Sequence, residues 1–198
     1  MPFSLSSSTP PPWRIDAWFN TPAPLSLQAL RGRVVVVLAF QMLCPGCVAH
    51  ALPLAARVHE RFAHDRVAMI GLHTVFEHHA AMTPTSLAAF LHEYRIAFPV
   101  GVDHADGQDP IPATMRAYAM RGTPSWLLFD PEGRLHAHWF GEIDPLRLGA
   151  EIGALLERAL PAGARAIGDG GAQASPTAET AAAAGCGDDG CTLDENRG

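Results

Sequence analysis

The feature that most constrains this chain is a buried-strand pattern followed at once by two closely spaced cysteines. The run RVVVVLAF at 33–40 is continuous, apolar and rich in valine, and it is too short for a helix of that composition. Such a run predicts a strand that is covered on both faces of a sheet. Cys44 and Cys47 follow shortly after it, and Pro45 suits the first turn of a helix, where its missing N–H costs nothing. The stretch therefore predicts a strand, a Cys-Pro-Gly-Cys (CPGC) motif and a helix.

Further along the chain, short apolar runs alternate with helical patterns. Besides 33–40, the predicted strands are 66–75, 98–103, 123–130 and 134–141, the last two as a hairpin, and the predicted helices are 46–63, 83–96, 112–120 and 144–160. The first of these helices contains Pro53, which predicts a bend or an interruption. This order of elements predicts an α/β fold with a central mixed β-sheet and helices on both faces.

Composition divides the chain into three parts. The Ser/Pro-rich residues 1–12 predict a loose N-terminal arm, and residues 13–160 carry the patterns of the folded domain. From residue 161 onward Ala, Gly, Ser, Thr and Pro dominate without a periodic apolar pattern, so residues 161–198 are expected to form a flexible, low-complexity linker and an acidic tail. The tail carries the other two cysteines, Cys186 and Cys191, spaced as Cys-x4-Cys.

Charge and hydropathy exclude several classes of function. The net charge is −6 and no basic stripe is present, which argues against nucleic acid as a partner. No apolar run approaches the roughly 20 residues of a membrane helix, so no membrane span is expected. The first residues lack the basic and apolar regions of a secretory signal, so the cytoplasm is the expected location, with the periplasm as the alternative if the start site is misassigned.

A Cys-x-x-Cys pair at the start of a helix points to thiol chemistry. Free N–H groups and the helix dipole stabilise a thiolate at that position, so Cys44 is the predicted nucleophile and Cys47 the predicted resolving cysteine. The dithiol carries two electrons itself, so no organic cofactor is expected. His50, one turn after Cys47, is a candidate for proton transfer or thiolate stabilisation, or else a surface residue of the helix.

The CPGC motif together with the stretch RGTPSWLLFDPEG resembles the thioredoxin superfamily. In that superfamily a cis-proline faces the Cys-x-x-Cys pair, and the residue before it offers backbone hydrogen bonds to a bound peptide. The resemblance implies that Thr123 and Pro124 form a substrate-binding edge. Pro45 and Gly46, the two residues that tune the redox potential, complete the predicted substrate-binding set.

Two longer stretches resemble the TlpA/ResA-like branch of that superfamily. SLQALRGRVVVVLAF resembles the lead-in to the active-site strand, and HTVFEHHAAMTPTSLAAFLHEYRIAFPVGVD resembles the extra helix and strand that this branch inserts. The resemblance covers about residues 13–160. It implies a thioredoxin-like fold and an enzyme, a protein-disulfide reductase or oxidoreductase, that exchanges electrons with protein thiols and disulfides and with an unidentified electron donor.

The motif departs from the family pattern at three places. Leu43 stands where a tryptophan usually precedes the first cysteine, the intervening dipeptide is Pro-Gly in place of the thioredoxin Gly-Pro, and His50 stands where the ResA-like branch often has a glutamate. These differences leave the redox potential and the direction of electron flow open.

Two alternatives use the same sulfurs. The tripeptide Pro45-Gly46-Cys47 resembles the peroxidatic loop of one peroxiredoxin branch. That interpretation would make Cys47 the peroxidatic and Cys44 the resolving cysteine. That branch has a threonine where this chain has Cys44, and its usual arginine just after the Thr-Pro pair is absent. A zinc site would combine the CPGC pair with Cys186 and Cys191, but Pro45 at a helix start favours thiol redox chemistry, so no metal is predicted.

The tail cysteines carry a hypothesis of their own. A dithiol on a long linker meets the active site at high effective concentration, so Cys186 and Cys191 are a candidate relay for electrons. The competing interpretation is a disordered tail with spectator thiols.

Overall fold

The valine-rich run forms the centre of the sheet. In the computed structural model, which describes residues 9–107 and 109–159, β2 (Val34–Phe40) pairs in parallel with β3 (Val67–His73) and antiparallel with β5 (Ser125–Phe129). All seven residues of β2 are buried. A strand with neighbours on both sides and layers on both faces meets only apolar groups, which is why its sequence shows no polar alternation.

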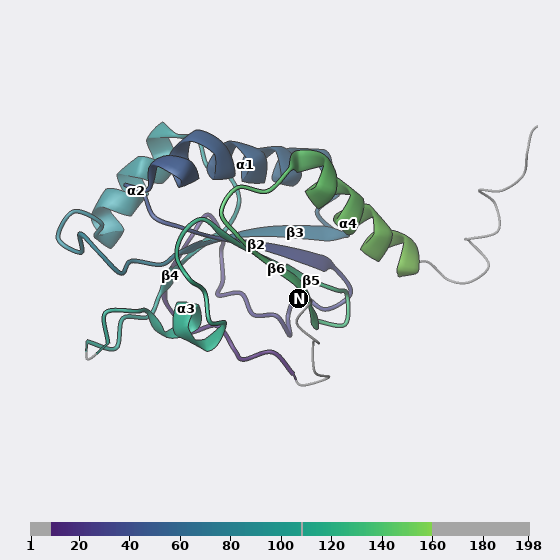
Figure 1. Cartoon of the computed structure of the whole chain (residues 1–198), viewed down its shortest axis with the longest axis horizontal. Helices are drawn as coiled ribbons and strands as arrows, with labels where there is room; N and C mark the ends of the chain where they lie inside the picture. The colour runs from purple at the N-terminus through teal and green to yellow at the C-terminus, as the bar shows by residue number, and fades with distance from the viewer. Residues whose placement is uncertain (1–8, 108, 160–198) are drawn as a thin grey trace, which may run out of the picture. The chain divides into compact units, whose positions relative to one another are not determined.

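Six strands make up the mixed sheet, in the order β1-β4-β3-β2-β5-β6 (Figure 1). The outer strands are β1 (Ile15–Phe19) and β4 (Val100–Asp103) on one side and β6 (Leu135–Phe140) on the other. β2, β3 and β4 run parallel, so their carboxyl ends meet at one edge of the sheet. The predicted α/β fold with a central mixed sheet is confirmed, and each predicted strand is found.

The sequence analysis missed β1. This edge strand pairs antiparallel with β4, and its register shifts between Ile15 and Ala17. Its residues are only partly buried and do not alternate cleanly, so the period of two that marks a half-buried strand is absent.

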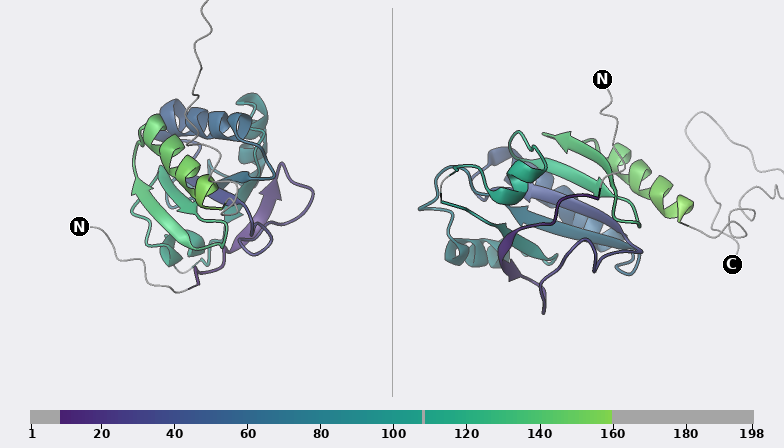
Figure 2. Two further views of the ribbon diagram at one scale, coloured as in Figure 1. Left: turned by 90° about the vertical axis from the view of Figure 1, so that its right-hand side faces the viewer. Right: turned by 90° about the horizontal axis from the view of Figure 1, so that it is seen from below.

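Helices cover both faces of the sheet, as predicted. The upper layer in Figure 1 holds α1 (Leu52–Arg61), α2 (Pro84–Glu93) and α4 (Pro145–Arg158). Alternate residues of β2, among them Leu38 and Phe40, point into this layer. The other face carries α3 (Ala113–Ala117) and the N-terminal segment, which cross it in the right-hand view of Figure 2.

The helix that follows the CPGC motif begins with an irregular turn. Cys47–Ala51 form a π-helical turn, η1, that leads directly into α1, and the N–H of Leu52 bonds to the carbonyl of Cys47. Pro53 follows at the first turn of α1. A proline has no N–H for the regular ladder, and a wider turn of this kind is a known way to absorb such a defect. The predicted interruption at Pro53 is therefore a widened turn inside a continuous helix.

Two helices begin at side-chain caps. The Thr83 hydroxyl accepts a hydrogen bond from the N–H of Ser86 at 3.2 Å, and the Asp144 carboxylate accepts one from the N–H of Arg147 at 2.8 Å. Such caps satisfy N–H groups that have no partner inside the helix. The cap at Asp144 fixes the start of α4, which lies beside the site described below.

The described residues contain no helix that is long and apolar enough to cross a bilayer. The predicted tail at 161–198 and most of the predicted arm at 1–12 lie outside these residues.

Candidate active site

The two cysteines of the CPGC motif lie at the carboxyl end of β2, where the chain turns into η1. Cys44 is partly exposed, whereas Cys47, the first residue of η1, is fully buried. The backbone N–H of Cys47 points at the sulfur of Cys44, with an N···S distance of 3.3 Å. Both cysteines are free thiols. One sulfur is thus open to a partner, and the second is held one helical turn away, inside the protein.

The Thr123–Pro124 segment lies opposite the motif. The peptide bond between these residues is cis. The thiol of Cys44 donates to the carbonyl oxygen of Thr123, with an S···O distance of 3.5 Å. A Cβ added to Gly46 would lie 3.7 Å from Cδ of Pro124, so these two residues also face each other. The fold thus places the predicted substrate-binding edge against the predicted nucleophile.

Burial controls the chemistry of Cys47. Burial, together with the hydrogen bond and the charge of Cys44, raises the pKa of its thiol to about 12, and burial is the largest of these causes. The hydrogen bonds from the backbone of Gln41 and the side chain of Thr123 act in the opposite direction and are the weaker influence. Cys47 therefore stays a neutral thiol at neutral pH.

His50 lies outside the immediate surroundings of the sulfurs. Its side chain is exposed, and it forms no hydrogen bond with any other described residue. It lines a pocket of about 150 Å³ together with Pro124, Trp126, Arg57 and Glu142. The structure therefore associates His50 with a side pocket of the site, and its predicted part in proton transfer stays a prediction.

Exposed apolar side chains flank the dithiol. Leu43, which replaces the usual tryptophan, is 56% exposed, and Phe140 is 49% exposed. The guanidinium carbon of Arg121 lies 5.3 Å from the centre of the Phe140 ring, a cation–π contact. The Phe140 ring also packs on Gly122, where an added Cβ would come within 3.0 Å of the ring. The sequence indicates Phe140 as a hairpin core or groove residue, but its contact with Arg121 depends on the pairing between β5 and β6 and is not predicted by a local pattern.

Metal ligands do not gather anywhere in residues 9–107 and 109–159. In these ranges no three His, Cys, Asp or Glu side chains are placed to hold an ion together. Cys186 and Cys191, which the relay and zinc hypotheses both require, lie outside the described residues.

Two free thiols at the start of a helix, facing a cis-proline across the end of a mixed sheet, define a thioredoxin-like protein. Solved structures agree. The chain is 59% identical to "Thioredoxin-like superfamily protein SPOA0173", with a TM-score of 0.74 over 77% of this chain and 99% of that one. It is 46% identical to a thiol-disulfide isomerase from Corynebacterium glutamicum, with a TM-score of 0.71 over 73% of this chain and 93% of that one.

Within this class, the family is shown by sequence. The model of the AhpC/TSA family matches residues 19–138, more than half of the chain, and the chain belongs to this family. It is also 30% identical over 132 residues to protein DipZ of Mycobacterium tuberculosis (strain CDC 1551 / Oshkosh), a match that covers 66% of this chain. The chain spans only 18% of the length of that curated relative.

Proposed function

We propose that this chain is a thiol–disulfide oxidoreductase that reduces protein disulfides through Cys44 and Cys47. The observation that carries the proposal is the asymmetry of the pair. Cys44 is partly exposed and its sulfur lies 3.5 Å from the Thr123 carbonyl, while Cys47 is fully buried. The name of the similar thiol-disulfide isomerase supports the same reaction class. The dithiol itself carries the two electrons in this proposal.

The reaction takes two exchange steps. The thiolate of Cys44 attacks one sulfur of a substrate disulfide, an enzyme–substrate disulfide forms, and the other substrate sulfur leaves as a thiolate that takes up a proton. Cys47 then loses its proton and attacks the sulfur of Cys44. The Cys44–Cys47 disulfide forms, and the second substrate thiol is released. Two electrons have moved to the substrate, and a donor dithiol must return them.

The environment of Cys47 favours this order of steps. In the free dithiol, burial and the neighbouring Cys44 together hold the pKa of Cys47 high. Once Cys44 is bonded to the substrate, it no longer offers its thiol or its negative charge, and both of its contributions to the raised pKa disappear. The hydrogen bond from Thr123, which lowers this pKa, remains. The thiol of Cys47 is therefore protonated and unreactive before the mixed disulfide forms, and its pKa is lower afterwards.

The surroundings of Cys44 set where the substrate chain would lie. Its sulfur lies 3.5 Å from the Thr123 carbonyl, the side chain of the preceding residue, Leu43, is exposed, and Phe140 pairs with Ser125 just after Pro124. A chain entering along Thr123 would meet backbone groups on one side and apolar side chains on the other. This arrangement suits an extended protein segment that carries a disulfide.

The peroxidase alternative fits this geometry less well. It makes Cys47 the sulfur that attacks peroxide, and that reaction needs a solvent-accessible thiolate. Cys47 is 0% exposed and its pKa is raised to about 12. The exposed sulfur belongs to Cys44, which is the attacking residue of the dithiol mechanism.

Single-cysteine variants test the proposal against that alternative. With insulin as the disulfide substrate, we expect Cys44→Ser to abolish reduction and Cys47→Ser to accumulate an enzyme–substrate disulfide at Cys44, seen by mass spectrometry. A parallel peroxide challenge of the wild type should give the Cys44–Cys47 disulfide slowly. Rapid oxidation of Cys47 to a sulfenic acid in the Cys44→Ser variant would establish the peroxidase instead.

His50 and the tail cysteines need separate tests. If His50 transfers a proton, His50→Gln should lower the rate of the second step and shift its pH profile; an unchanged profile would remove that role. If Cys186 and Cys191 relay electrons, their double replacement by serine should slow turnover with at least one reductant. Unchanged turnover with every reductant tried would leave them as spectators.

The compartment also remains a prediction. The cytoplasmic expectation can be checked by fractionation of the source cells with thiol trapping. Recovery of the protein in the cytoplasmic fraction with Cys44 and Cys47 reduced is the expected result, and recovery from the periplasm would contradict it.

A further inference from the structure

The side chain of Gln41 links the loop that carries the dithiol to the loop that follows β3. Gln41 stands directly after β2, shortly before Cys44, and it is only 1% exposed. Its side-chain oxygen accepts a hydrogen bond from the N–H of Phe76, at 3.3 Å. Its Nε2 donates to the carboxylate of Glu77, also at 3.3 Å. Both ends of this buried amide are therefore fixed to one short segment of the neighbouring loop.

The backbone of Gln41 contacts both cysteines. Its carbonyl oxygen accepts a hydrogen bond from the N–H of Cys44, at 3.2 Å. Its backbone also forms a hydrogen bond with the thiol of Cys47, and this bond lowers the pKa of that thiol. A hydrogen bond that lowers a thiol pKa is one that favours the thiolate. One residue thus holds the loop after β3 with its side chain and both cysteines with its main chain.

The two side-chain hydrogen bonds fix the main chain of Gln41 at the point where the regular sheet ends. Phe40 is the last residue of β2 that pairs with β3, and its carbonyl accepts a hydrogen bond from the N–H of Thr74 at 3.1 Å. Beyond this bond, the Gln41 amide joins the two loops. It takes the place that backbone pairing has within the sheet. Removal of the amide therefore frees the backbone that contacts the two cysteines.

We propose that Gln41 is a positioning residue for the second exchange step, because its side chain holds the main-chain group that stabilises the attacking thiolate of Cys47. In that step the thiolate attacks the sulfur of Cys44, the Cys44–Cys47 disulfide forms, and the substrate sulfur leaves as a thiolate that takes up a proton. Bonded to the substrate, Cys44 no longer acts on Cys47 as a thiol or a charge. The hydrogen bonds from Gln41 and Thr123 are then the ones that favour the thiolate. The inference rests on the proposed function and adds a residue to the same site.

A small reagent isolates this step. Methyl methanethiosulfonate converts Cys44 into a methyl disulfide and releases methanesulfinate, after which Cys47 displaces methanethiol and closes the Cys44–Cys47 disulfide. Mass spectrometry follows the loss of the adduct across a pH range, in the full-length protein with Cys186 and Cys191 replaced by serine. In Gln41→Leu we expect displacement at pH 7 to be about ten-fold slower, because loss of a charge-assisted hydrogen bond changes an equilibrium by about that factor or more. The pH profile of the displacement should move to higher pH.

Thr74→Val is the matched control. It also removes a buried side-chain hydrogen bond at the start of the loop after β3, the bond from the Thr74 hydroxyl to Asp103 at 3.0 Å. This variant should lose stability but keep the wild-type pH profile of displacement. A wild-type profile in Gln41→Leu would overturn the proposal, and so would an equal change of profile in Thr74→Val.

Variants of Glu77 make the test independent of the folding of Gln41→Leu, because Glu77 is exposed. Glu77→Gln keeps an oxygen that accepts from the Gln41 amide, whereas Glu77→Leu removes it, and both variants lose the same charge. We expect Glu77→Leu to displace methanethiol about two-fold more slowly than Glu77→Gln, the effect of one modest hydrogen bond. Equal rates in the two variants would contradict the proposal.

Hydrogen exchange separates this proposal from the proposed function. The N–H of Cys44 donates to the Gln41 carbonyl, so in ¹⁵N-labelled protein its exchange should be faster in Gln41→Leu than in wild type and unchanged in Thr74→Val. If the methyl adduct of the wild type never resolves, the proposed function fails, and the exchange rate of this N–H still decides whether Gln41 positions the loop. An unchanged rate in Gln41→Leu would overturn the inference.

Discussion

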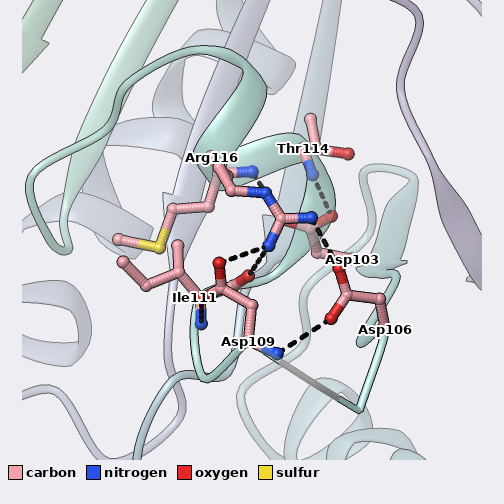
Figure 3. A network of polar contacts seen from close by, with 7 residues as sticks. Asp103, Asp106, Asp109, Ile111, Thr114 and Arg116 are labelled. Carbon is pink, nitrogen blue, oxygen red and sulfur yellow. Dashed lines mark hydrogen bonds and ion pairs between the residues drawn. The ribbon is translucent and has the colours of Figure 1, made fainter.

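Two loops leave the same edge of the sheet, and they differ in how fully their polar groups are hydrogen-bonded. The loop after β4 begins at Asp103 and holds a closed network of hydrogen bonds and ion pairs (Figure 3). The loop after β2 carries Cys44 and leads into Cys47. There Cys44 is partly exposed, and the indole N–H of Trp126 on β5 has no partner among the described residues.

The network after β4 shows what a purely structural polar cluster looks like in this protein. The buried carboxylate of Asp103 accepts hydrogen bonds from the N–H groups of Thr114 and Met115 at 2.8 and 2.9 Å and from the Thr74 hydroxyl at 3.0 Å. Burial raises the pKa of Asp103, and these hydrogen bonds, which lower it, only partly offset the effect of burial. Nearer the surface Arg116 pairs with Asp106 and Asp109 at 2.5 and 2.7 Å.

The contrast separates groups that hold the fold from groups that are free to react or bind. Where every donor and acceptor is satisfied, a ligand has little to gain, and a mutation costs stability. The Trp126 indole N–H is buried with no partner among the described residues, which costs the fold a small amount of free energy, and the thiol of Cys44 is partly exposed to solutes. Four predictions follow, from the largest expected effect to the smallest; three compare the two loops, and one extends the comparison to a buried histidine of β3.

The two thiols should differ most in reactivity. With Cys186 and Cys191 replaced by serine, iodoacetamide at pH 7 should modify Cys44 and leave Cys47 untouched, because a pKa of about 12 leaves almost no thiolate at Cys47. We expect Cys47 to react at least about 1,000-fold more slowly than an ordinary thiol. Peptide mapping by mass spectrometry measures both rates, and comparable labelling of Cys47 in the folded protein would remove the asymmetry on which the mechanism depends.

Removal of the buried carboxylate should damage the fold rather than the chemistry. Asp103→Ala leaves two N–H groups and one hydroxyl without an acceptor, so the free energy of unfolding should drop by about 3 kcal/mol. Urea titration measures this loss, and disulfide reduction per folded molecule should be unchanged. A loss of activity in protein that is still folded would show that the β4 loop takes part in the site.

A buried histidine should make the protein sensitive to acid. His73 is fully buried beside Phe40, and both of its ring nitrogens lack a partner among the described residues. Burial lowers its pKa from 6.5 to about 4. The folded state therefore binds the proton less readily than the unfolded state, so stability is complete above pH 6.5 and falls as the pH drops toward 4, by on the order of 3 kcal/mol.

The matched variant for that prediction is His73→Phe, which keeps an aromatic ring beside Phe40 and removes the titrating group. Unfolding free energies at pH 7 and pH 4.5 should differ much less in the variant than in the wild type. Equal pH dependence in the two proteins would mean that His73 does not set the acid limit.

The smallest effect belongs to the outer part of the β4 network. Arg116→Gln breaks two ion pairs at the surface, where such pairs contribute about 1 kcal/mol or less. The loss should shrink further in 0.5 M salt. Thermal unfolding at low and high salt checks this, and a loss as large as that of Asp103→Ala would show that the surface pairs and the buried carboxylate act as one unit.

The sequence predicted the parts of this protein that local patterns determine. Continuous apolar runs marked β2 and β3, and Asp144 marked the start of α4. The family resemblance pointed to Thr123 and Pro124 as the edge that faces the dithiol, and the fold places them there. Each of these features depends on neighbouring residues or on a motif.

Features that depend on distant partners were not predicted. β1 is an edge strand defined by its pairing with β4, across more than 80 residues of chain. The pocket is lined by His50 from η1, Arg57 from α1 and Trp126 from β5. These residues are far apart in the sequence, so no local pattern predicts that they line one pocket. That the Trp126 indole N–H has no partner among the described residues is likewise a property of the packed molecule alone.

A thiol-trapping redox titration of the full-length protein, with mass mapping of every disulfide, tests the central claim most directly. The account predicts one reversible two-electron transition in which Cys44 and Cys47 form a disulfide with each other, and Cys47 shows no sulfenic or sulfinic acid. If no Cys44–Cys47 disulfide forms at any potential, or if oxidation begins as a sulfur–oxygen adduct at Cys47, the dithiol mechanism is wrong.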